Sequence, residues 1–277
     1  MFEEKMALMD AAEANRQIAR NIEVHNQVAQ KYEALHGEIF NDIEQDRLAA
    51  ALARARDSVR TGSDALKALD FGCGSGNLSR HMLDLGLHVT AADVSPDFLR
   101  LVERRFPSER LSLLEMNGSD LSNIDDSSFD LIAAYSVLHH IPDYLAAIAE
   151  LARVCKPGGV IMLDHEHTEE YWLGDPVYSE FRGAALRFDW RKYLTPSNYV
   201  HKVRRLINPR HTNEGDIHVF PDDHILWSKI KALLAGAGFE TVFEKDYLLY
   251  HSRYRREVFE RYNGRCTDTK LMIFRKL

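Results

Sequence analysis

Strand-like and helix-like segments alternate between residues 65 and 166, and this order constrains the fold more than any other feature of the sequence. The strand-like segments are apolar and short, and they cover residues 65–71, 88–93, 110–117, 129–136 and 160–166. The helix-like segments cover residues 77–86, 95–106 and 142–159. Apolar strands joined by helical crossovers predict a parallel sheet that is covered on both faces. With right-handed crossovers this α/β sheet is doubly wound, and its ligand is expected beyond the C-terminal ends of the strands.

The sequence on either side of this core has a different character. Residues 1–60 have the apolar spacing and the composition of helices, and a Thr-Gly-Ser break follows them. Residues 168–221 interrupt the alternation of strands and helices and are rich in aromatic and basic side chains. From residue 222 the chain returns to a helix, a Gly-Ala-Gly stop and two strand-like segments. We therefore expect an insertion at 168–221 on the ligand-binding rim of one sheet.

The turn after the first predicted strand reads DFGCGSGNLS and contains three alternating glycines. A phosphate-binding P-loop would need a Lys-Ser or Lys-Thr pair, which this turn lacks. A dinucleotide fingerprint would need a third glycine where Asn77 stands. The pattern is instead G-x-G-x-G, at Gly72, Gly74 and Gly76, and Asp70 stands directly before it. An acid at this position would repel a pyrophosphate and would suit a cation.

This turn and the residues after it resemble the class I S-adenosylmethionine-dependent methyltransferases, nearest to the ubiquinone and menaquinone type (the methyltransferase type 11 branch). The likeness rests on the turn, on Asp93 at the end of the second strand, on Asp120 in NGSDLSNID, and on FDLIAAYSVLHHIPDYLAAIAELARVCKPGGVIML. It covers about residues 66–163. It implies a Rossmann-like, mostly parallel sheet of seven strands. The implied cofactor, S-adenosylmethionine, carries an ammonium and a sulfonium but no phosphate, which agrees with the charge of Asp70.

The resemblance also implies roles for single residues. Asp70 is expected to receive the methionine ammonium, Asp93 both ribose hydroxyls, and Asp120 the adenine amino group. The alternatives are a helix-capping role for Asp93 and an Asx-type turn for Asp120. The glycines are expected to pass close to the cofactor, where a Cβ would collide with it. The expected cofactor-binding residues are Tyr32, Asp70, Gly72, Cys73, Gly74, Gly76, Asp93, Val94, Ser119, Asp120, Leu121, Tyr135 and Ser136.

By analogy with related enzymes, residues 1–60 are expected to form a helical lid over the cofactor, from which Tyr32 reaches it. An amphipathic helix that packs on the sheet, with Tyr32 in the core, is the alternative. The expected organisation is a lid (1–60), a cofactor-binding core (61–167), a substrate-binding insertion (168–221), and a C-terminal helix with closing strands (222–277).

Four histidines follow the fourth and fifth predicted strands: His139, His140, His165 and His167. Methyl transfer needs a general base only if the acceptor is protonated when bound. We predict His140 as that base, because it directly precedes the start of the next helix. On a strand, His165 and His167 would share one face, as two metal ligands do. Two ligands are too few, and we predict no metal site.

The composition of the chain limits the kinds of binding partner that we expect. The net charge of −7 and the pI near 6.0 give no support for nucleic-acid binding. The sequence shows no signal peptide and no membrane-spanning segment, and its three cysteines are dispersed, so we expect a cytoplasmic protein without a membrane partner. The aromatic and basic insertion favours a small acceptor that is anionic or aromatic. We expect a small-molecule methyltransferase, monomeric or homodimeric. The alternatives are a non-catalytic cofactor-binding or partner-binding module and a protein or RNA methyltransferase.

Overall fold

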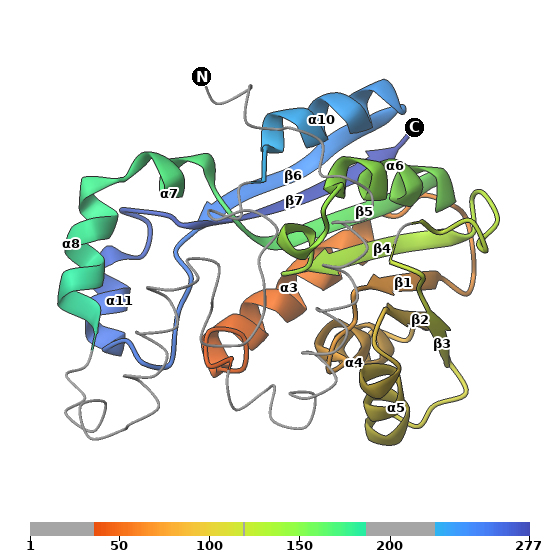
Figure 1. The fold of residues 1–277 in the computed structure, drawn as a ribbon, viewed down its shortest axis with the longest axis horizontal. Helices are drawn as coiled ribbons and strands as arrows, with labels where there is room; N and C mark the ends of the chain where they lie inside the picture. Colours follow the sequence, from red (N-terminus) through yellow and green to blue (C-terminus); the bar gives the residue numbers. More distant parts are fainter. Residues whose placement is uncertain (1–35, 119, 187–224) are drawn as a thin grey trace, which may run out of the picture.

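One seven-stranded sheet runs through the described part of the chain, in the order β3-β2-β1-β4-β5-β7-β6 (Figure 1). This computed structural model describes residues 36–118, 120–186 and 225–277. The strands are β1 (Lys67–Phe71), β2 (His88–Asp93), β3 (Leu111–Glu115), β4 (Phe129–Tyr135), β5 (Cys155–His167), β6 (Phe239–Tyr247) and β7 (Thr269–Lys276). Neighbours pair in parallel from β3 to β5, whereas β7 is antiparallel to both β5 and β6. The predicted doubly wound, mostly parallel sheet is confirmed.

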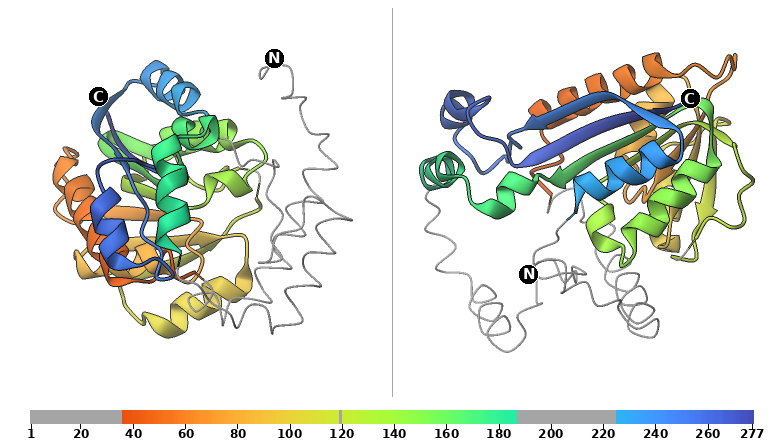
Figure 2. Two further views of the ribbon diagram at one scale, coloured as in Figure 1. Left: turned by 90° about the vertical axis from the view of Figure 1, so that its left-hand side faces the viewer. Right: turned by 90° about the horizontal axis from the view of Figure 1, so that it is seen from above.

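Helices cover both faces of this sheet (Figure 2). One face carries α3 (Asp42–Ser58), α4 (Asn77–Asp84) and α5 (Pro96–Arg105), and the other carries α6 (Tyr144–Val154) and α10 (Trp227–Gly236). A short 3-10 helix, η2 (Leu138–His140), lies between β4 and α6. None of the helices in the described ranges is long and apolar enough to span a bilayer.

Local capping residues set where two of these helices begin. Ser95 caps α5 by accepting a hydrogen bond from the backbone N–H of Phe98 at 3.3 Å, and Pro96 stands at the first helical position. Helix α6 begins at Tyr144 rather than at Pro142, where the sequence pattern places it. The reason is that the side chain of Asp143 accepts a hydrogen bond from Ala146 N at 2.9 Å and so forms the cap.

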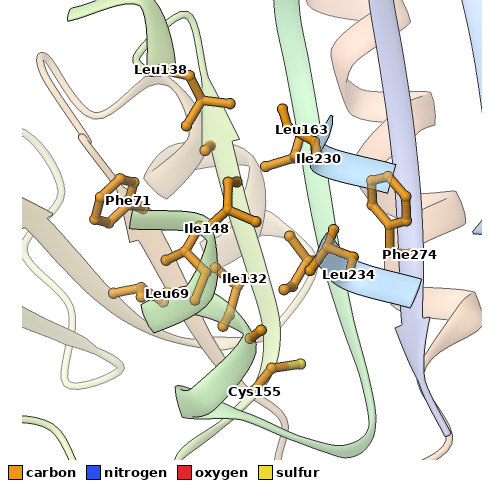
Figure 3. Close-up of a cluster of buried hydrophobic side chains, with 14 of the residues drawn as sticks. Leu69, Phe71, Ile132, Leu138, Ile148, Cys155, Leu163, Ile230, Leu234 and Phe274 are labelled. Carbon is orange, nitrogen blue, oxygen red and sulfur yellow. The ribbon is translucent and has the colours of Figure 1, made fainter. Parts of the chain in front are cut away.

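The core consists of one apolar layer on each face of the sheet. Between the sheet and helices α6 and α10 lie Leu69, Phe71, Ile132, Leu138, Ile148, Cys155, Leu163, Ile230, Leu234 and Phe274 (Figure 3). On the other face, Leu48 and Leu52 of α3 are fully buried against β4 and β5 residues such as Met162. Each such leucine truncated to alanine would cost about 2–5 kcal/mol. Helix α3 lies within the predicted lid, but it packs on the sheet and forms part of the helical layer on this face.

A smaller helical unit lies beyond the end of the sheet, at the left of Figure 1. It consists of α7 (Glu169–Leu173), α8 (Pro176–Ala185) and α11 (Arg256–Tyr262), and the last of these comes from the connection between β6 and β7. Phe181 of α8 is fully buried against Phe259 and Tyr262 of α11. The first part of the predicted insertion therefore packs against a segment that the sequence pattern assigned to the closing strands. The four boundaries remain a prediction.

Candidate active site

A cleft opens at the C-terminal ends of β1, β2 and β4, where the crossover pattern predicts the ligand. Its volume is about 1270 Å³, including the space at its open mouth. The predicted residues that line it are Asp70, Gly72, Cys73, Gly74, Asp93, Val94, Asp120, Leu121, Tyr135, Ser136 and His140. Gly76 is not among the lining residues, and Tyr32 and Ser119 lie outside the described residues. The structure thus brings most of the predicted site together.

All three glycines of the turn have positive φ angles, +73° at Gly72, +48° at Gly74 and +87° at Gly76. A Cβ on Gly72 would lie 2.3 Å from the side chain of Val137, and one on Gly76 would lie 2.7 Å from that of Phe106. At these two positions protein side chains already exclude a Cβ, and the approach of a cofactor to them remains a prediction. At Gly74 no described atom lies within 4 Å of the added Cβ, so this glycine is the one that leaves room for a ligand.

Asp70 is a buried carboxylate with one oxygen turned to no protein partner. Its side chain is 1% exposed at the end of β1, and its Oδ2 accepts a hydrogen bond from Ser79 Oγ at 2.6 Å. Among the described residues, Oδ1 has no hydrogen-bond partner. Burial raises the pKa of Asp70 to about 7, and the nearby charge of Asp93 adds to the effect. A cation in the cleft would satisfy Oδ1 and favour the ionised carboxyl.

Asp93 connects the end of β2 to the glycine turn. Its Oδ2 accepts a hydrogen bond from Gly74 N at 2.8 Å, and its Oδ1 accepts one from Ser95 N at 2.8 Å. The residue that caps α5 is Ser95, and Asp93 holds the backbone of that cap rather than forming it, as the capping alternative would require. A carboxylate has about four acceptor sites, so two backbone donors leave capacity for a pair of hydroxyls. The side chain lines the cleft, so a ribose-binding role fits this geometry together with the support that Asp93 gives to the turn and to Ser95.

Asp120 forms the Asx-type turn that was its alternative. Its Oδ1 accepts hydrogen bonds from Asn117 Nδ2 at 3.0 Å, Ser122 N at 3.1 Å and Ser122 Oγ at 2.6 Å. Hydrogen bonds from these two residues lower the pKa of Asp120 to about 2. The residue also lines the cleft, beside the buried side chain of Leu121. An ionised acceptor next to an apolar wall suits a base with an exocyclic amino group.

Arg47, for which we found no signal in the sequence, joins α3 to the sheet. Its Nε donates to Glu44 Oε2 at 2.6 Å and its Nη1 to Asp164 Oδ2 at 2.9 Å, while the guanidinium lies 3.9 Å above the Tyr247 ring. In the described ranges, Arg47 Nη2 and Tyr135 Oη are buried without a hydrogen-bond partner. Unsatisfied buried donors of this kind need a ligand or water. Helix-former composition cannot single out one arginine whose partner is 117 residues away.

Comparisons with known proteins agree with this geometry. Residues 69–163 match the family model described as a methyltransferase domain. Over these residues the chain carries a methyltransferase domain. A curated relative, the ubiquinone biosynthesis O-methyltransferase of Xanthomonas campestris pv. campestris strain B100, is 33% identical over 108 residues, which are 38% of this chain and 45% of that protein. The chain thus matches less than half the length of that relative.

Solved structures show the same fold over most of the chain. One is a chain of the complex between the Haloferax volcanii Trm112 methyltransferase activator and a methyltransferase, with a TM-score of 0.56, 17% identity, and coverage of 90% of this chain and 96% of that one. Another is an S-adenosylmethionine-dependent methyltransferase from Mesorhizobium loti, with a TM-score of 0.53, 18% identity, and coverage of 82% and 98%. At these identities the likeness shows the fold alone.

A buried acid of β5 holds the loop that follows β4. Glu166 of β5 is 3% exposed, and its Oε1 accepts hydrogen bonds from Val137 N at 3.0 Å and Leu138 N at 2.8 Å. Its Oε2 lies 2.8 Å from His139 Nδ1. The His139 and His140 rings are 4.0 Å apart, and His140 lines the cleft as predicted. Sequence reasoning considered the histidines of DHEH and overlooked the glutamate between them.

The other two histidines of the domain have separate environments. His165 has a φ of +66° and stands at an irregularity in the pairing of β5 with β7, and its ring packs 4.6 Å from that of Tyr135. His167 Nδ1 lies 3.0 Å from Asp268 O, and its ring stacks on Tyr171 at 3.8 Å. The irregularity interrupts the alternation on which a shared face of His165 and His167 would depend.

Proposed function

We propose that this protein is an S-adenosylmethionine-dependent methyltransferase that acts on a small molecule. The observation that carries the proposal is Asp70, a buried carboxylate in the cleft whose Oδ1 has no hydrogen-bond partner among the described residues. A phosphate-bearing nucleotide would be repelled there, whereas an ammonium would find a counter-charge. The match of residues 69–163 to a methyltransferase domain supports the same cofactor.

The cleft residues would divide the binding of the cofactor among them. Asp70 would hold the ammonium, Asp93 the ribose hydroxyls, and Asp120 the adenine amino group beside Leu121. Asp70 pairs with Ala133 across β1 and β4, so Tyr135, two residues further on, shares its face of the sheet. Tyr135, which also lines the cleft, would therefore donate its Oη hydrogen to the methionine carboxylate.

The bound cofactor supplies an electrophilic methyl group on a sulfonium. The contribution of the protein is to align an acceptor with that methyl and to exclude water, and alignment of this kind can be worth up to about 10 kcal/mol. The lining of the cleft includes, besides His140, apolar side chains such as Phe71, Met116 and Ile141. An apolar wall with a few polar groups suits an aromatic acceptor. The printed name of the curated relative, an O-methyltransferase of ubiquinone biosynthesis, supports this class.

We extend the proposal to the setting of the protein. The three cysteines, Cys73, Cys155 and Cys266, are free and buried, which suits a reducing cytoplasm. A monomer or homodimer, with no nucleic-acid partner, remains our expectation from the charge.

The proposal is tested by product formation. The purified protein is incubated with S-adenosylmethionine and a panel of aromatic acids, phenols, amines and sugars, and S-adenosylhomocysteine is quantified. Release with an aromatic or anionic acceptor supports a small-molecule methyltransferase. Tight binding of S-adenosylhomocysteine with no release across the panel would favour the binding-module alternative, and release only with protein or RNA substrates would favour the other.

A further inference from the structure

Glu166 is a buried carboxylate outside the cleft lining, and three of the four candidate histidines gather around it. His139 is hydrogen-bonded to it, and His140 and His167 interact with its charge. Its other oxygen is held by two backbone N–H groups of the loop that carries His139 and His140. A carboxylate that orients an imidazole through Nδ1 is the arrangement that supports a general base in hydrolases.

The structure places this arrangement directly behind the cleft wall. The His139 ring packs against the His140 ring at 4.0 Å with a tilt of 46°, and His140 lines the cleft. When Glu166 is ionised it can only accept a hydrogen bond, so the Nδ1 of His139 then carries the hydrogen and the ring is held in one orientation. Glu166 therefore sets both the backbone of η2 and the orientation of the ring on which His140 packs.

We propose that Glu166, through His139, positions His140 as a general base and stabilises its protonated form, so that the acceptor is a hydroxyl group. This inference rests on the proposed methyltransferase function. In the balanced step, the hydroxyl proton passes to the His140 ring while the oxygen bonds to the methyl carbon. The carbon–sulfur bond breaks with its electron pair on sulfur, and the proton later leaves His140 for solvent. His140 is the catalytic residue, and Glu166 and His139 are positioning residues.

Other charged groups also lie near Glu166. Lys270 stands opposite it on β7, but the Lys270 ammonium is bound to Glu244 and Asp246, at 2.9 and 2.6 Å. On its own strand, His167 is the second imidazole that interacts with the Glu166 charge. Burial raises the pKa of Glu166 to about 7, so the ionised form that a base requires is gained as pH rises through neutrality.

The test compares two matched acceptors, 4-hydroxybenzoate and 4-mercaptobenzoate, at pH 8. The thiol is already ionised and needs no base, whereas the phenol is largely protonated. The two variants are Glu166→Gln and His139→Asn, the second of which keeps an amide near the position of Nδ1. Each should slow methylation of the phenol about 10- to 100-fold. Each should leave the rate of thiol methylation within about 3-fold of the wild-type rate. In Glu166→Gln the rise of phenol methylation with pH should move to lower pH, because the loss of the carboxylate lowers histidine basicity.

Asp268→Asn is the matched control, since Asp268 is also a buried acid, with a pKa raised to about 6, but lies outside the cleft lining. It should leave the ratio of the two acceptor rates unchanged. Equal losses with both acceptors in the Glu166 and His139 variants, or no loss, would overturn the inference while the proposed function stands. A wild-type protein that binds S-adenosylhomocysteine but methylates neither probe, nor any acceptor of the panel, would overturn both.

Discussion

The carboxylate of Asp93 accepts a hydrogen bond from the backbone N–H of Gly74 at 2.8 Å, so the acid that ends β2 and the glycine turn that follows β1 form one unit. The second Asp93 oxygen fixes Ser95, the N-cap of α5. A residue that would hold the ribose thus also determines the shape of the turn against which the cofactor would lie.

Replacement of Asp93 should therefore affect both binding and stability. Asp93→Ala should abolish S-adenosylhomocysteine binding and lower the free energy of unfolding by about 2–3 kcal/mol, because two backbone donors lose a charged acceptor. Urea unfolding and calorimetry measure the two effects. Glu103→Ala, an exposed position on the same α5, should change neither. Unchanged affinity in Asp93→Ala would show that the ribose lies elsewhere.

Ionisation of Asp70 should lower the stability of the ligand-free protein and raise its affinity for the cofactor. Its pKa in the folded protein, about 7, lies above the ordinary 3.8, so its ionisation destabilises the folded state as pH rises through 7. Asp70→Asn should accordingly make the ligand-free protein more stable than wild type at pH 8, by up to a few kcal/mol, and should weaken cofactor binding. Thermal unfolding at pH 5.5 and pH 8 checks the sign, and a variant less stable than wild type at pH 8 would contradict it.

The same shift predicts proton release on binding. Below pH 7 Asp70 is protonated in the free protein, and an ammonium ligand favours its ionised form. Calorimetric titrations with S-adenosylhomocysteine at pH 6.5, in buffers of different ionisation enthalpy, should show proton release that Asp70→Asn abolishes. Proton uptake, or release that persists in the variant, would assign the linkage to another group.

Two glycines of the turn should respond differently to alanine. Gly72→Ala creates a 2.3 Å contact with Val137 and should destabilise strongly, with partial recovery in the Gly72→Ala/Val137→Ala double variant. Gly74→Ala meets no described protein atom within 4 Å and should lose only the 1–2 kcal/mol or so that a left-handed residue costs, yet it should bind the cofactor poorly. Normal cofactor affinity in Gly74→Ala would show that no ligand approaches this backbone.

The helical unit of α7, α8 and α11 should be dispensable for cofactor binding. Phe181→Ala removes a fully buried ring from between α8 and α11 and should cost about 3–5 kcal/mol. Exposed Leu173, at 84% accessibility, is the control and should tolerate alanine. If the unit serves only the acceptor side, folded Phe181→Ala should keep its affinity for S-adenosylhomocysteine, and a parallel loss of affinity would place the unit in the cofactor site.

Local signals made much of this structure predictable. Ser95 and Pro96 mark the start of α5, the glycine turn marks the end of β1, and the alternation of segments gives a doubly wound sheet. Each signal lies within a few residues of the feature it determines. For the same reason the Asx-type turn of Asp120 could be given as the alternative to an adenine-binding role, because its hydrogen-bond donors are only three and two residues away.

What the sequence did not reveal depends on distant partners. Arg47 meets Asp164 across 117 residues, and Glu166 meets His139 across 27. The packing of α11 against α8 likewise joins two segments that have no common pattern. The contact that excludes a Cβ at Gly72 was not foreseen, because Val137 comes from the loop after β4. Such pairs can be identified only from the folded structure, because it is the order of the strands in the sheet that brings these distant residues together.

The most direct test of the account is a calorimetric titration of the wild-type protein with S-adenosylhomocysteine and, separately, with NAD. A cleft built around the buried carboxylate of Asp70 should bind S-adenosylhomocysteine, with loss of affinity in Asp70→Asn, and should bind NAD at least about 100-fold more weakly, because its pyrophosphate would face that carboxylate. Tighter binding of NAD than of S-adenosylhomocysteine would contradict the account.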